Sequence, residues 1–190
     1  MSRPTSPAQD TQAWQLYVEL EDVRPKVWRR LLVPLTIELP RLHVMLLWGT
    51  GWDGGHVHEF VFGHDHYGDK EPGLDFPDVA NEEGVTLSQA LGSRKTFQYI
   101  YDYGDNWWHK VKVEKIVTLD SLVEYAQCIG GENACPPEDV GGAPGYEEFL
   151  EALADPNHPE HAELKRWIGR PFDARAFDID AINTRLNARE

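Results

Sequence analysis

Three histidines and two aspartates of this chain occur at spacings that suit a metal centre. His56 and His58 are two positions apart, so in a β-strand both imidazoles point to the same side and can bind one ion. Further along, the segment YDYGDNWWH places Asp102, Asp105 and His109 around a turn. Imidazole nitrogens and carboxylate oxygens are ligands for zinc and manganese. We therefore predict a divalent-metal site, for zinc or manganese, built from His56, His58, Asp102, Asp105 and His109.

The same residues also have a purely structural interpretation. Phe60 follows on the side of His56 and His58, which predicts that both rings lie at the rim of the core and bond to the backbone or to a carboxylate. The tripeptide Gly104-Asp105-Asn106 is ordinary hairpin-turn chemistry, in which Asp105 bonds backbone amides. An isolated HxH pair is a weak signal, so the metal and the structural interpretations both stay open.

A second polar segment, CIGGENACPPEDVGG at residues 128–142, contains adjacent acids. Glu138 and Asp139 are candidates for a catalytic base or a cation ligand, and the alternative is that they cap the following helix. Six residues separate Cys128 from Cys135, which is too many for the CxxC pairing of a zinc knuckle or a thioredoxin-type redox site.

Signatures of several large enzyme classes are absent from the sequence. The chain has no GxSxG, GxxxxGK[ST] or HExxH segment, and no GxGxxG follows a predicted strand. We therefore favour a non-catalytic binding or interaction module. The alternative is a metal-dependent hydrolase that uses the predicted His and Asp ligands, with Glu138 or Asp139 as base. Whether the protein is an enzyme is left open at this stage.

The charge distribution bears on the partner. The chain of 190 residues has a formal charge of −14, and residues 116–164 contain eleven Asp and Glu but no Lys or Arg. This acidity disfavours nucleic acid and predicts an unidentified protein or small molecule as the partner. A nucleic-acid-associated role is the weaker alternative and rests on a basic cluster: Arg24, Lys26, Arg29, Arg30 and Arg41.

No run of about 18 apolar residues and no signal-peptide pattern occurs, so we predict a cytoplasmic protein that does not enter a membrane. Residues 1–12 are rich in Ser, Pro and Gln and predict a disordered tail before a single domain at residues 13–190. Alternation predicts strands at residues 14–20, 27–33, 56–62, 96–103 and 107–119. Helical spacing and capping residues predict helices at residues 39–49, 86–91, 146–154, 159–168 and 179–189. Early strands and late helices indicate an α+β fold, with an antiparallel roll-like sheet covered by helices and a helical C-terminal third.

Seven ordered blocks give the chain a family resemblance: RPKVWRRLLVP, LHVMLLWGTGW, HVHEF, YDYGDNWWH, CPPEDVGGAPGY, DPNHPEH and FDARAFDIDAIN. Together they resemble the Ri-plasmid ORF-three-like proteins, which bacteria and archaea carry on plasmids and chromosomes. The resemblance covers the chain from Trp14 onward and implies an α+β roll-like domain, an association with mobile elements and no assigned catalytic role. The polar positions that match the family blocks are Arg29, Arg30, His43, His56, His58, Asp102, Asp105, His109, Glu138 and Asp139.

Overall fold

A computed structural model describes residues 11–69, 78–119 and 125–188 of the chain. Within these ranges eight strands form one sheet in the order β5-β4-β3-β6-β7-β1-β2-β8. Neighbouring strands are antiparallel except for β4 and β5, which pair in parallel. The strands are β1 (Gln12–Leu20), β2 (Trp28–Pro34), β3 (His58–Phe62), β4 (Asp65–Gly68), β5 (Ala80–Asn81), β6 (Thr96–Tyr101), β7 (Trp107–Thr118) and β8 (Gln127–Glu132). The helices are α1 (Leu39–Thr50), α2 (Leu87–Leu91), α3 (Gly142–Ala154), α4 (His161–Ile168) and α5 (Ile179–Leu186).

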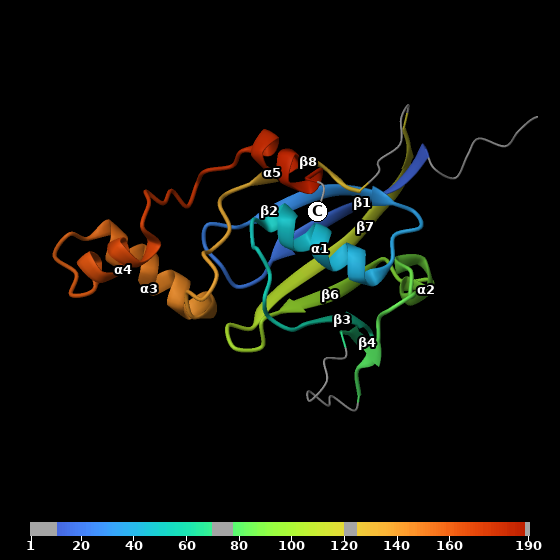
Figure 1. Ribbon diagram of the computed structural model, residues 1–190, viewed down its shortest axis with the longest axis horizontal. Coiled ribbons are helices and arrows are strands. Elements are labelled where there is room, and N and C mark those ends of the chain that lie inside the picture. The colour runs from blue at the N-terminus through green and yellow to red at the C-terminus, as the bar shows by residue number, and fades with distance from the viewer. Residues whose placement is uncertain (1–10, 70–77, 120–124, 189–190) are drawn as a thin grey trace, which may run out of the picture.

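The core lies between one face of the sheet and α1, which crosses that face (Figure 1). Pro40 in the first turn of α1 fixes a helical φ where no N–H partner is needed, and Gly51 ends the helix in the left-handed region at φ 107°. Leu42, Met45 and Leu46 of α1 are buried with the inward side chains of the strands. On the other face, Lys110 and Lys112 alternate with buried Val111 and are exposed.

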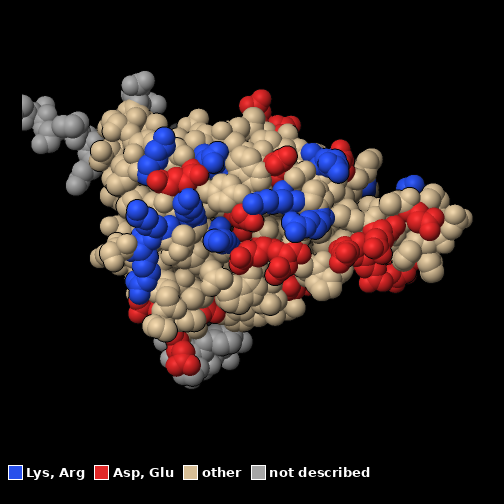
Figure 2. All heavy atoms as spheres, turned by 180° about the vertical axis from the view of Figure 1, so that it is seen from behind, with Lys and Arg blue, Asp and Glu red and all other residues tan. Residues whose placement is uncertain are grey.

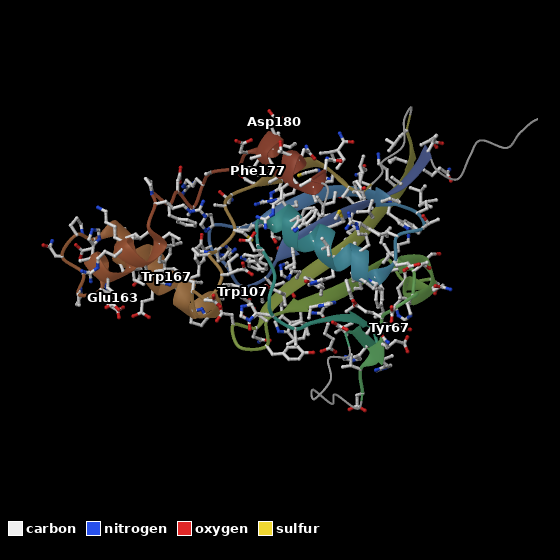
Figure 3. All side chains as sticks on the ribbon, in the orientation of Figure 1. Tyr67, Trp107, Glu163, Trp167, Phe177 and Asp180 are labelled. Atoms are coloured by element: carbon white, nitrogen blue, oxygen red, sulfur yellow. The ribbon has the colours of Figure 1, made fainter. Side chains whose placement is uncertain are left out.

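Helices α3 and α4 form an arm that projects away from the sheet (Figure 1). Phe149 of α3 contacts Trp167 and Phe172 edge to face, with ring centroids 5.9 and 5.3 Å away, and these contacts hold the arm together. No residue of α4 is buried. Figure 3 labels Glu163 and Trp167 on α4, far from the sheet, and Phe177 close to the start of α5. The buried residues of the arm therefore belong to α3.

The predicted α+β class is confirmed, and most predicted elements are present within a few residues of the expected bounds. Thr86 caps α2 as predicted, and the structure adds a full capping box, because Thr86 accepts from the Gln89 amide while the Gln89 side chain accepts from Thr86 N–H. Strand β1 begins at Gln12, so the predicted tail at residues 1–12 is too long, and its first ten residues lie outside the described ranges. Helix α3 begins at Gly142 rather than at residue 146.

Strands β4, β5 and β8 were not predicted. Strand β8 (QCIGGE) contains two glycines, which normally weaken a strand. The structure explains one of them, because a Cβ at Gly131 would lie 2.4 Å from the Phe177 ring. The parallel β4–β5 pair corrects the expectation of a wholly antiparallel sheet, and the sheet is largely antiparallel instead. In the described part of the chain, no helix is long and apolar enough to cross a membrane.

Candidate metal centre

Three segments meet at one end of the sheet. His56 precedes β3, Asp102 follows β6, and Asp139 lies in the loop between β8 and α3. Strands β3 and β6 are paired with His58 opposite Tyr101, and the Asp102 amide extends that ladder by donating to the Val57 carbonyl at 2.9 Å. The pairing of these two strands therefore brings His56 and Asp102 together.

The His56 ring lies between two carboxylates. Its Nδ1 atom is 3.6 Å from an Asp102 oxygen, and its Nε2 atom is 3.1 Å from an Asp139 oxygen. Each of the three residues offers one ligand atom, and these atoms all lie within 4.8 Å of one another. The Asp102 side chain is 11% exposed and that of Asp139 is 68% exposed, so the cluster has a buried side and a side open to solvent. One imidazole and two carboxylates are a donor set that zinc and manganese accept.

Asp102 is held in place by the backbone around it. One of its oxygens, Oδ1, accepts from the Gly104 amide at 2.8 Å, which leaves Oδ2 facing His56. Asp102 has φ 57° and Asp139 has φ 60°, both in the left-handed region. Aspartate enters this region more readily than most residues because its side chain bonds nearby backbone groups.

His58 lies in a different cluster in the same part of the molecule. Its Nε2 atom is 2.9 Å from Glu82 Oε2, and both side chains are only 5% exposed. The His43 ring stacks on His58 with centroids 3.6 Å apart, and His43 Nδ1 lies 2.7 Å from the Tyr99 hydroxyl. Burial, reinforced by the neighbouring His58, lowers the pKa of His43 to about 3. His43 is therefore neutral at physiological pH.

A pocket of about 540 Å³ connects the two clusters. Its lining includes His43, His56, His58 and Glu82, together with Pro40, Gly55, Val57, Asp69, Asn81 and Glu83. No Lys or Arg of the described chain lines it. The pocket is consequently acidic and favours a cationic or metal-bound ligand.

The remaining predicted site residues have structural partners. His109 is buried, its Nδ1 lies 3.2 Å from the Tyr99 carbonyl oxygen, and burial lowers its pKa to about 4. Asp105 accepts from the Gly141 amide at 3.1 Å. Glu138 accepts from the Tyr101 hydroxyl at 2.7 Å and from the Asp53 amide at 2.9 Å.

The structure thus gathers His56 and Asp102 from the predicted metal ligands and adds Asp139, which the sequence indicated as a candidate base. His58 lines the adjoining pocket, whereas His109 and Asp105 are outside the cluster. Sequence reasoning did not find Glu82 or the role of His43. Glu82 follows a two-residue strand with no pattern around it, and His43 lies in the amphipathic pattern of a helix.

Substituting Tyr101 with phenylalanine tests whether the loop of residues 133–141 is fastened to the sheet by Glu138. The hydroxyl–carboxylate bond is part-buried, and its removal is expected to lower the free energy of unfolding by about 1–2 kcal/mol. Urea unfolding measures the change. Tyr67→Phe is the matched control, because the Tyr67 hydroxyl makes no hydrogen bond to any residue that the structure describes. Equal effects of the two substitutions would contradict a fastening role for Glu138.

Comparison with known proteins agrees with the family blocks. The family model described as "Plasmid pRiA4b ORF-3-like protein" matches residues 12–181. The chain is 40% identical over 173 residues to "Uncharacterized protein y4hQ" of Sinorhizobium fredii (strain NBRC 101917 / NGR234), covering 89% of this chain and 88% of that protein. The crystal structure of the protein of unknown function MM3350 from Methanosarcina mazei Go1 superposes with a TM-score of 0.80 at 34% identity, covering 89% of this chain and 96% of that one. On these matches, the chain belongs to the plasmid pRiA4b ORF-3-like protein family.

Proposed function

We propose that the protein is a binding module that holds a divalent metal ion on His56, Asp102 and Asp139. A cationic or metal-bound ligand would bind in the acidic pocket beside the ion. The observation that carries this proposal is the convergence of one imidazole and two carboxylates within 4.8 Å. Three protein ligands leave coordination positions for water or for an atom of the ligand.

The rigidity of the cluster supports an ion site. Asp102 is buried at the end of a strand pair, and its Oδ1 is already committed to the Gly104 amide. Metal affinity depends on such support, because residues bonded to the ligands orient them before the ion arrives. His56 and Asp139 are the exposed members and provide a route of entry for the ion.

The charge around the cluster supports it as well. Asp69, Glu82 and Glu83 line the adjoining pocket, and no cationic side chain of the described residues offsets them there. A cation on His56 would reduce the repulsion between these carboxylates and those of Asp102 and Asp139.

Isothermal titration of tag-free, EDTA-treated protein with zinc and manganese chloride tests the proposal. We expect one ion per chain. The free energy of unfolding should rise by about 2.7 kcal/mol when the free ion is at 100 times its Kd. His56→Gln and Asp102→Asn should each weaken binding at least tenfold, by loss of one ligand of three. His64→Gln removes an exposed histidine outside the cluster and should leave binding unchanged. Absence of binding at millimolar ion, or equal weakening by all three variants, would refute the proposal.

A metal-dependent hydrolase is the second candidate, and one observation favours it. The His58–Glu82 pair lines the same pocket as His56, and a carboxylate that orients an imidazole is a common arrangement for a general base. A metal-bound water has its pKa lowered toward neutrality and would be the nucleophile. Zinc- or manganese-dependent hydrolysis of p-nitrophenyl esters that His58→Gln abolishes, with metal binding intact, would favour the hydrolase over the binding module.

A further inference from the structure

We propose that the uncovered face of the sheet binds single-stranded nucleic acid through a basic band formed by Arg94, Lys95, Lys110 and Lys112. This surface lies on the opposite side of the sheet from α1, and the inference does not depend on the metal centre.

The basic band combines two neighbouring strands with the turn before them. Lys110 and Lys112 of β7 stand on either side of buried Val111, so both point away from the core. Their cross-strand neighbours on β6 are Gln98 and Thr96, which are uncharged. Arg94 pairs with Asp65 at 3.2 Å, whereas none of the three lysines forms an ion pair with a residue in the described ranges. The lysine charges are therefore available to an anionic partner.

A shallow cavity of about 530 Å³ lies within this band. Arg94, Lys95 and Lys110 line it together with the polar side chains of Thr96 and Gln98 and with one acid, Glu21. Three cations and two hydrogen-bonding side chains around one hollow suit the phosphate groups of a nucleic-acid backbone.

Aromatic rings adjoin the basic band on the same face. Tyr17 of β1 is directly opposite Lys112, and its ring stacks on Trp28 of β2 with centroids 5.5 Å apart. The Arg30 guanidinium carbon lies 5.3 Å from the Trp28 ring centroid. Tyr17 and Trp28 are both partly exposed. Cations beside aromatic rings on an open sheet match single strands, whose bases are free to stack, better than duplexes, whose bases are already stacked.

The overall charge of −14 opposes nucleic-acid binding, but the charges are not spread evenly over the surface. Figure 2 shows Lys and Arg across this face with Asp and Glu among them, while Asp and Glu dominate the projecting arm. The acids among the aromatic rings are already paired, Glu19 with Lys26 at 2.8 Å and Glu114 with Arg30 at 2.7 Å. At physiological ionic strength the screening length is about 8 Å, so distant acids repel the bound strand weakly. Lys26 and Arg30 of the basic cluster expected at residues 24–41 are therefore paired with acids.

Fluorescence anisotropy with labelled oligo(dT) and oligo(U) of about 12 nucleotides tests the proposal. Four phosphate contacts predict a slope of log K against log salt of about −2.8, which is roughly a 50-fold loss between 50 and 200 mM KCl. The Lys110→Gln/Lys112→Gln variant should weaken binding at 50 mM salt and make the slope shallower by about 1.4. Tyr17→Leu should weaken binding about 5- to 150-fold at an unchanged slope, because it removes stacking and no charge.

Lys165→Gln/Arg166→Gln on α4 is the matched control, since it removes the same charge from another surface. It should leave affinity unchanged, and thermal melting checks that every variant is folded. The proposal fails if no binding occurs at 50 mM salt, if both double variants weaken binding equally, or if a duplex binds as tightly as the single strand.

Discussion

Alanine in place of Gly142 is expected to destabilise the fold by about 3 kcal/mol or more and to weaken divalent-ion binding. Gly142 has φ 71°, in the region that a Cβ disfavours. An added Cβ would also lie 2.4 Å from the Asp105 carbonyl oxygen, a backbone atom that cannot rotate away. The hairpin tip and the loop before α3 must therefore separate. Asp139 lies in that loop and Asp102 in that tip, so the two carboxylates separate with them.

Gly84→Ala is the matched control for this substitution. Gly84 has φ 73°, but nothing lies within 4 Å of a Cβ built there. It measures the backbone strain alone, which is about 1–2 kcal/mol. Urea unfolding of both variants gives the difference, and zinc titration gives the effect on the ion site. If Gly142→Ala costs no more than Gly84→Ala, the docking of hairpin on loop is not the contact that shapes the metal centre.

Acidification is the second large perturbation, and we expect the free energy of unfolding to fall by about 4 kcal/mol between pH 7.5 and pH 5. Burial holds the pKa of His109 at about 4 and that of His43 at about 3, against 6.5 for an ordinary histidine. Below pH 6.5 these two histidines bind protons in the unfolded chain but stay neutral in the folded protein. Stability is therefore complete above pH 6.5 and is lost as the pH falls toward 4 and 3. Each histidine contributes about 2 kcal/mol of the loss at pH 5.

Single substitutions separate the two contributions. His109→Gln and His43→Gln should each reduce the pH-dependent loss by about half, whatever they do to stability at pH 7.5. His64→Gln, in the exposed turn between β3 and β4, should leave the loss unchanged. Urea midpoints at several pH values provide the measurement. An unchanged loss in both buried variants would show that other groups, such as carboxylates, cause the acid sensitivity.

Part of the candidate site could be predicted from local pattern. Strand alternation places His58, Phe60 and Phe62 on the buried side as predicted, whereas His56, expected on that side too, precedes β3 and is exposed. The hairpin around residues 104–106 forms where its turn residues predicted. Continued alternation along β6 would put Asp102 on the other face of the sheet from Tyr99 and Tyr101, but the backbone departs from the strand there. The strand ends at Tyr101, and the left-handed backbone at Asp102 redirects its carboxylate toward His56. Such a change of backbone direction at the end of a strand depends on tertiary packing and cannot be inferred from periodicity.

The sequence by itself determined the α+β class, the main strands and helices, the family, and the residue types able to bind an ion. Those properties follow from period, capping and composition, which act within a few residues along the chain. Only the tertiary structure decided which side chains meet. Asp139 reaches His56 because the loop after β8 packs on the hairpin tip, and Glu82 reaches His58 across 24 residues. The separation of β7, which carries Lys110 and Lys112, from the arm is likewise a result of folding (Figure 1). Contacts between distant segments depend on how packed surfaces fit, and a local pattern carries no information about that fit.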